Sequence, residues 1–194
     1  LAKSESQGVY LDGLTALSAD TAHALSKWKD FDELCLNGLT MLSPKTAEAL
    51  AKCKCCHLDL NGLTTLSAEA AETLAKWKGD HLHLNGLTAL SDATAEALTK
   101  CRFSLTLNGL TMLSVEAAVA LAKRTCDELS LDGLTAISVE VAEALAKCKC
   151  NQLSLCGLTT ISGESAEALA KWNGFSLDLN GLSTLSIEAA TALA

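Results

Sequence analysis

Three of the four histidines in this chain lie near a cysteine and an aspartate at positions that repeat every 24 residues. The five residues of this group are Cys35, His57, Asp59, His81 and His83. Thiolate, imidazole and carboxylate groups are the ligands that zinc and similar ions take in proteins. A cysteine beside a histidine is also an arrangement used in nucleophilic catalysis. The third interpretation is a polar binding surface. We adopt it, so that no cofactor is expected and a divalent metal such as zinc is the alternative.

The 24-residue spacing runs through all 194 residues, which contain eight copies of one unit of 23–25 residues. The unit is clearest at residues 58–77, and its marker glycine recurs in every copy. The marker glycines are Gly13, Gly38, Gly62, Gly86, Gly109, Gly133, Gly157 and Gly181. A fixed period of this length predicts a solenoid in which each repeat contacts only its neighbours. We therefore expect a single elongated domain over residues 1–194.

Each unit predicts a strand, a turn and a helix. Leucines alternate over residues 58–60, which is the pattern of a short strand. Asn61-Gly62 follows and predicts a turn, since both residue types tolerate a positive φ. Ser67 has the chemistry of a helix N-cap, and residues 68–76 are rich in strong helix formers. One unit buries too little leucine surface to offset the entropy of ordering it, so the repeats must fold together.

The unit resembles a leucine-rich repeat, in a bacterial variant with the body Gly-Leu-Thr-x-Leu-Ser-x-Glu-Ala-Ala. The resemblance covers nearly the whole chain and implies an α/β solenoid, with a parallel β-sheet on its concave face and helices on its convex face. The family usually has Asn or Cys three residues after the second strand leucine, where this chain has Leu63, Leu87 and Leu110. The internal asparagine ladder of the family is therefore absent or displaced. The asparagines at the displaced position are Asn37, Asn61, Asn85, Asn108 and Asn180.

Strand alternation predicts which side chains leave the core. If Leu58 and Leu60 point inwards, then His57 and Asp59 point outwards, and the same rule applies in every repeat. The resemblance implies that this outward surface binds the ligand. Its predicted residues are Tyr10, Glu33, Cys35, His57, Asp59, His81, His83, Thr106, Glu128, Ser130, Gln152, Ser154 and Asp178.

Nine cysteines are distributed unevenly over the repeats. Cys53, Cys101 and Cys148 share the position at the end of the helix with the tryptophans, so we expect them to act there as small hydrophobic residues. Cys126 and Cys150 lie at equivalent positions of adjacent repeats and are candidates for a disulfide. Since disulfides form in oxidising compartments, we expect an extracellular or cell-surface protein.

Composition and charge argue against two classes of partner. A net charge of −8 and an aromatic content of 4% disfavour nucleic acid. The chain has no run of about 18 apolar residues, so no membrane span is expected. The sequence therefore favours a non-enzymatic binding and scaffolding module whose concave face contacts a protein or another macromolecule.

Two alternatives stay open on the sequence alone. Leu1-Ala2-Lys3 and Ala192-Leu193-Ala194 correspond to nearly the same phase of the repeat, and neither end carries a polar cap. This pattern favours a slice of a longer array, or a structural protein whose copies stack end to end into fibres through their uncapped ends. The second alternative is a metal site or metalloenzyme built on the five residues named first.

Overall fold

The chain forms a row of eight coils, each made of a strand, a turn and a helix. The structure is a computed structural model that describes residues 7–29 and 31–194. The strands are β1 (Gly8–Tyr10), β2 (Glu33–Cys35), β3 (His57–Asp59), β4 (His81–His83), β5 (Ser104–Thr106), β6 (Glu128–Ser130), β7 (Gln152–Ser154) and β8 (Ser176–Asp178). The helices are α1 (Ala19–Leu25), α2 (Pro44–Leu50), α3 (Ala68–Leu74), α4 (Asp92–Leu98), α5 (Val115–Ala122), α6 (Val139–Leu145), α7 (Gly163–Leu169) and α8 (Ile187–Leu193). The predicted helical phase of residues 1–3 lies outside the described residues.

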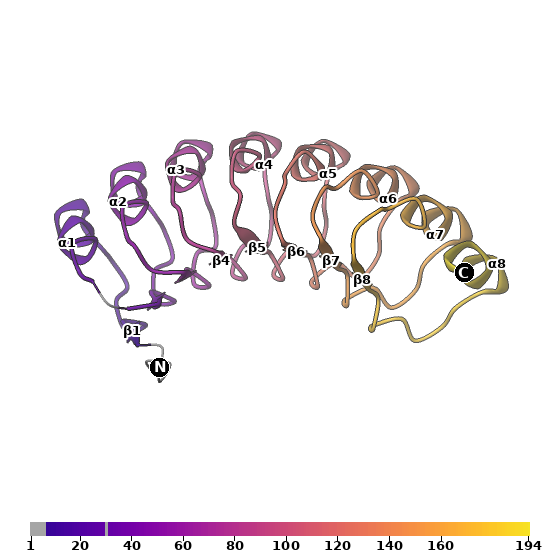
Figure 1. The fold of residues 1–194 in the computed structure, drawn as a ribbon, viewed down its shortest axis with the longest axis horizontal. Helices are drawn as coiled ribbons and strands as arrows, with labels where there is room; N and C mark the ends of the chain where they lie inside the picture. Colours follow the sequence, from indigo (N-terminus) through magenta and orange to yellow (C-terminus); the bar gives the residue numbers. More distant parts are fainter. Residues whose placement is uncertain (1–6, 30) are drawn as a thin grey trace, which may run out of the picture.

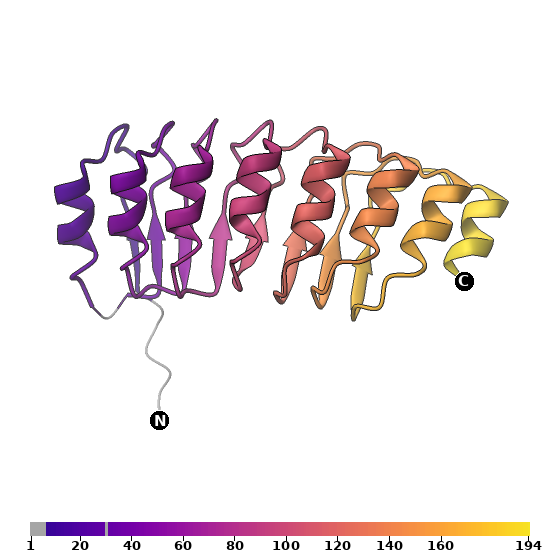
Figure 2. The same ribbon diagram turned by 90° about the horizontal axis from the view of Figure 1, so that it is seen from above.

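Helices and strands form the two layers of an open arch. Figure 1 shows the helices along the outer, convex side and the strands along the inner, concave side. In Figure 2 the helices lie side by side in chain order, each next to the helix of the following coil. All eight strands join one parallel sheet in sequence order, and their central residues stay in register, as Leu58 does with Leu34 and Leu82. The predicted α/β solenoid, with its sheet on the concave face, is confirmed.

The interior of the solenoid is a continuous stack of leucines. In the third coil, Leu58, Leu60 and Leu63 are fully buried. Each helix begins directly after a serine, as the sequence predicts. Ser67 Oγ, for example, accepts a hydrogen bond from the backbone N–H of Ala70 at 3.2 Å. That bond satisfies one of the N–H groups that the start of a helix leaves without a partner. Capping and shared burial thus produce the same coil eight times.

The marker glycines allow close packing of successive coils. The predicted turn is present at each of them, although none of the eight has a φ in the left-handed region. A Cβ atom on Gly109 would overlap the carbonyl oxygen of Asn85 and would lie 2.7 Å from that of Leu87. The backbone of one coil therefore rests directly on the backbone of the coil before it, which only glycine permits. Gly13 lies in the first coil, and a Cβ atom there would meet nothing within 4 Å.

A ladder of polar side chains runs beside the marker glycines. The backbone N–H of Asn61 donates to Oδ1 of Asn37 at 2.9 Å, and that of Asn85 donates to Oδ1 of Asn61 at 3.0 Å. Equivalent bonds join the coils on both sides, from the carboxylate of Asp12 to that of Asp132. Each bond satisfies a backbone amide at the turn between strand and loop. The asparagine ladder is thus present at the displaced position.

The ladder stops at Cys156, which stands where other coils have Asn or Asp. The backbone N–H of Cys156 still donates to Oδ1 of Asp132 at 2.9 Å, but the cysteine sulfur is a weak acceptor. Asn180, in the next coil, donates its N–H to Asp178 of its own coil at 3.0 Å. At the ladder, the last coil is therefore tied to the seventh only by a weak contact of the Asn180 N–H with the Cys156 sulfur, where the second to seventh coils have a bond to an oxygen acceptor of the coil before.

A Cys156→Asn variant is expected to restore this bond and to stabilise the last coil by about 1 kcal/mol, a typical net value for one hydrogen bond. The amide hydrogen of Asn180 should then exchange with solvent about fivefold more slowly, because local opening becomes rarer. Hydrogen exchange followed by NMR measures this rate. Cys156→Ala, which supplies no acceptor, is the control, and equal protection in the two variants would contradict the ladder's role.

Candidate functional site

The concave face carries two columns of outward side chains, and their register is the one that the sequence predicts. On β2, β3 and β4, the first column contains Glu33, His57 and His81, and the second contains Cys35, Asp59 and His83. The sheet therefore brings together the five residues that the sequence analysis grouped, and it places Glu33 beside them.

The three histidines of this group stack on one another. The ring centroids of His57 and His81 are 4.6 Å apart, and the two rings are nearly parallel, with an interplanar angle of 7°. The ring of His83 lies 6.5 Å from that of His57 and 6.3 Å from that of His81. Stacked rings present flat faces with polar edges. This part of the concave face therefore offers a half-buried platform on which a partner can pack.

Glu33, Cys35 and Asp59 form a compact group, which we name the thiol–carboxylate cluster. Cys35 Sγ lies 3.5 Å from Glu33 Oε1 and 3.6 Å from Asp59 Oδ2. The hydroxyl of Tyr10 donates to the other carboxylate oxygen of Glu33, Oε2, at 2.8 Å. One potential ligand atom from each member of the cluster lies within 4.8 Å of the other two. The cluster thus joins residues of both columns around one point.

His83 lies at the open side of the thiol–carboxylate cluster. Its Nε2 atom is 3.7 Å from Asp59 Oδ1, and its Nδ1 atom is 2.9 Å from Oγ1 of Thr106. Asp59 Oδ1 is buried and has no hydrogen-bond partner. Buried carboxylate oxygens normally have one, so this atom stands out among the polar atoms of the face.

Burial and charge keep both Cys35 and His83 neutral at pH 7. Burial, followed by the charges of Asp59 and Glu33, raises the pKa of the Cys35 thiol to about 12. Burial also lowers the pKa of His83 below its ordinary value, although the Asp59 carboxylate opposes the shift. A protonated thiol is a poor nucleophile. The electrostatics of the cluster therefore oppose Cys–His catalysis.

In the C-terminal half of the predicted surface, some side chains form hydrogen bonds with other residues of the protein. Ser130 is buried, and its hydroxyl is hydrogen-bonded to Asn108 and Asp132. The hydroxyl of Ser154 also donates to Asp132. Ser130 was predicted to belong to the ligand-binding surface, but its hydroxyl is hydrogen-bonded to residues of the ladder and is not available to a ligand. The predicted residues of this half that stay exposed or half-buried without such a ladder bond are Glu128, Gln152 and Asp178.

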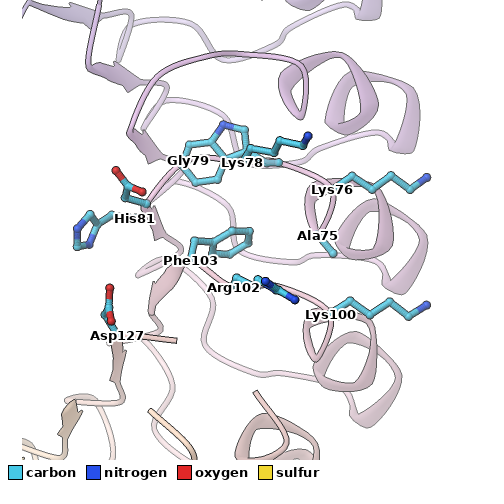
Figure 3. A pocket seen from close by; sticks show the side chains of 11 residues that line it. Ala75, Lys76, Lys78, Gly79, His81, Lys100, Arg102, Phe103 and Asp127 are labelled. Carbon is cyan, nitrogen blue, oxygen red and sulfur yellow. The ribbon is translucent and has the colours of Figure 1, made fainter. Parts of the chain in front are cut away.

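A hollow at the edge of the face was not predicted from the sequence. It lies where helices end and the next strands begin, has a volume of about 590 Å³, and is lined in part by His81, Arg102, Phe103 and Asp127. Figure 3 shows His81 and Asp127 on its strand side and Phe103 between them and the helices. The hollow thus extends the concave face sideways, next to the histidine platform.

Trp77 and Gly79 belong to the lining of this hollow, and a tryptophan followed two residues later by glycine recurs at Trp172 and Gly174. A Cβ atom on Gly79 would overlap the ring of Trp77, so the ring covers this glycine and no side chain projects from it. The Trp172 ring covers Gly174 in the same way. The coil before Trp77 has Cys53 and buried Cys55 at the two equivalent positions. The pattern shows that one large ring fills the space that two small side chains fill elsewhere.

The column at the helix ends is buried as predicted, except at Trp28. Its three cysteines are core residues. Trp28, however, is 48% exposed, and Arg124 is completely buried. Arg124 Nη2 donates to the carbonyl oxygen of Phe103 at 2.6 Å, and the guanidinium lies 5.7 Å from the centre of the Phe103 ring. A carbonyl oxygen and an aromatic face receive part of its charge, while Arg124 Nε and Nη1 have no hydrogen-bond partner among the described residues.

Cysteines gather beside Arg124. Cys148 Sγ lies 2.9 Å from Cys150 Sγ. A hydrogen bond from Cys150, assisted by the positive charge of Arg124, lowers the pKa of the Cys148 thiol to about 7. All nine cysteines belong to the described residues and are free thiols there. The disulfide between Cys126 and Cys150 stays a prediction.

Comparison with known proteins identifies similar solved structures. No family model and no curated protein matches the chain. A solved structure of the leucine-rich repeat-containing protein LegL7 from Legionella pneumophila is similar, with 17% sequence identity and a TM-score of 0.41, over 97% of this chain and 88% of that one. Within residues 7–29 and 31–194, no helix has the length and apolar character needed to cross a membrane. Eight in-register strands, a leucine interior and a helix after each strand give this chain the α/β solenoid fold of a leucine-rich-repeat protein.

Proposed function

We propose that the chain is a non-enzymatic binding module and scaffold that recognises a protein through its concave face. The observation that carries the proposal is the contrast between a constant coil and varied outward columns. Leucines, capping serines and marker glycines recur in every coil, whereas the outward positions hold aromatic, acidic, thiol, imidazole and hydroxyl side chains. A regular solenoid with such a face is suited to recognising an extended partner.

The charge of the face indicates the chemistry of that partner. The outward columns contain the carboxylates of Glu33, Asp59, Glu128 and Asp178, and in the eight described strands they contain neither Lys nor Arg. The whole chain carries a net charge of −8. Complementary charge speeds encounter and selects partners. The proposed partner is therefore a protein segment that presents Lys and Arg side chains.

Two synthetic peptide pools of equal length, one rich in Lys and Arg and one rich in Asp and Glu, test this proposal with the full chain. The basic pool is expected to bind and the acidic pool to fail. Glu128→Lys should weaken the binding of the best basic peptide at least tenfold, because it places a like charge in the face. Fluorescence anisotropy of the labelled peptide measures the affinity.

Glu143→Lys is the matched control, since Glu143 is an exposed residue of the convex helix α6. It makes the same change in net charge and should alter the affinity less than twofold. Equal losses in the two variants would show that net charge alone attracts the peptide. That result, or a preference for the acidic pool, would overturn the proposal.

End-to-end assembly and a location outside the cell stay hypotheses of the sequence analysis. Light scattering over a range of protein concentrations checks the first, since stacking makes the mean mass rise with concentration.

A further inference from the structure

We infer that Glu33, Cys35, Asp59 and His83 form a binding site for one divalent cation of the zinc type on the concave face. This inference goes beyond recognition of a protein partner. It rests on the positions of four potential ligand atoms: Glu33 Oε1, Cys35 Sγ, Asp59 Oδ and His83 Nε2.

The spacing of these atoms suits three ligands around one ion, with His83 next to Asp59 as the fourth. Consecutive separations are 3.5 Å from Glu33 Oε1 to Cys35 Sγ, 3.6 Å from Cys35 Sγ to Asp59 Oδ2, and 3.7 Å from Asp59 Oδ1 to His83 Nε2. Zinc bonds of about 2.0–2.3 Å to oxygen, nitrogen and sulfur place the corners of a tetrahedron about 3.3–3.8 Å apart. The three separations fall in that range, with Asp59 using Oδ2 towards Cys35 and Oδ1 towards His83. His83 lies outside the group of three whose ligand atoms are all within 4.8 Å of one another, so its ring must move towards Cys35 and Glu33 when an ion binds. One sulfur, one nitrogen and two carboxylates form a suitable ligand set.

Two neighbouring hydroxyls orient the ligands. Tyr10 donates to Glu33 Oε2 and leaves Oε1 directed at the cluster. Thr106 is hydrogen-bonded to Nδ1 of His83 and leaves Nε2 directed at Asp59. Metal-binding histidines usually have their second ring nitrogen held in this way, which fixes the tautomer and the ring orientation. The site therefore has the supporting contacts of a metal centre in addition to its ligands.

Charge and burial favour a cation at the centre of the four residues. Two carboxylates converge there on a buried thiol, and the outward columns of the described strands supply no Lys or Arg to balance them. The partnerless Oδ1 atom of Asp59 is buried at the same point. A divalent ion would neutralise the carboxylates, satisfy that oxygen and stabilise the thiolate of Cys35.

The inferred ligand set differs from the five residues grouped by the sequence. His57 and His81 lie in the other column, where their rings stack on each other. Glu33 takes their place, because its side chain reaches across to Cys35 two residues further along the same strand. His81 is therefore a natural control for His83, as it has the same residue type on the same strand.

Cobalt(II) is the probe for the test, because its absorption spectrum reports both tetrahedral geometry and thiolate ligation. The full chain, reduced and freed of metal by a chelator, is titrated with Co²⁺ and then with Zn²⁺. We expect one equivalent of Co²⁺ to bind with intense visible bands and a thiolate-to-cobalt charge-transfer band, and Zn²⁺ to displace it. Cys35→Ser should abolish the charge-transfer band, and Asp59→Asn and His83→Gln should each weaken binding at least tenfold.

His81→Gln and Cys56→Ser are the controls, and both should bind Co²⁺ within twofold of the parent chain. Serine and threonine already occupy the column of Cys35 in β5, β6 and β7, so Cys35→Ser is expected to fold, which circular dichroism checks. A spectrum that lacks tetrahedral bands would overturn the inference. So would a charge-transfer band that survives in Cys35→Ser, since the metal would then lie on other cysteines.

Discussion

A Gly109→Ala variant is expected to lose about 3 kcal/mol or more of its free energy of unfolding. The added methyl group would overlap the carbonyl oxygen of Asn85 and press on that of Leu87. Both contacts are backbone atoms of the preceding coil, which cannot rotate away as a flexible side chain can. Relief therefore requires the two coils to separate, and separation weakens strand pairing, the ladder bond and leucine packing together. Urea unfolding followed by circular dichroism measures the loss.

Gly13→Ala is the matched control for this variant. The residue type and its place in the repeat are the same, but a Cβ atom on Gly13 meets nothing within 4 Å among the described residues. Its stability should change by less than about 1 kcal/mol, and the lower entropy of the unfolded chain even favours alanine slightly. Similar losses at Gly13 and Gly109 would mean that backbone conformation, and not contact between coils, makes the glycines necessary.

Raising the pH above 9 is expected to destabilise the protein, and three buried core thiols alone contribute roughly 4 kcal/mol per pH unit. Burial raises the pKa of Cys53 to about 11 and the pKa values of Cys55 and Cys101 to about 12, from an ordinary value of 9.0. Below pH 9 these thiols are protonated in both states, so their contribution to stability is fully present. Between pH 9 and 11 the unfolded chain loses the protons of these three thiols, which the folded chain keeps, at a cost of about 1.4 kcal/mol per proton and pH unit. Cys35, whose pKa is also about 12, adds to this loss.

Urea unfolding between pH 7.5 and 10.5 in the presence of a reductant checks this expectation. The triple variant with alanine at positions 53, 55 and 101 should be less stable at pH 8 but should lose much less stability above pH 9. Cys148 does not add to the slope there, because its pKa of about 7 leaves it ionised in both states above pH 9. Parallel pH profiles for the parent and the triple variant would show that other groups cause the alkaline loss.

The fold could be predicted because each local signal occurs eight times. One serine or one Leu-x-Leu pair is weak evidence, but eight copies in phase leave no other arrangement of strand, turn and helix. The outward columns followed from alternation and register alone. The same reasoning identified the asparagines of the displaced ladder, since residues at the same phase of adjacent coils must lie next to each other.

The details of the candidate site depend on side-chain conformations, which periodicity does not contain. Glu33 was predicted for the outward surface but not for the metal-ligand group, yet its carboxylate lies 3.5 Å from the Cys35 thiol. Ser130 was expected to face outwards, yet the nearby Asp132 holds its hydroxyl in the ladder. Arg124 shares a column with Cys and Trp and is buried like them, because Phe103 supplies an aromatic face and a carbonyl oxygen. In each of these three cases, contacts with individual neighbouring residues determine the conformation or the burial of the side chain.

The in-register ladder also makes the coils exchangeable. Because each asparagine from Asn37 to Asn108 accepts from the coil after it and donates to the coil before it, removal of one complete 24-residue block would leave the flanking coils with matching partners. Duplication of a block would do the same. The length of the binding face can therefore be increased or decreased in steps of one strand, about 4.8 Å each, by evolution or by protein engineering. The recognition residues on the remaining strands would keep their relative positions.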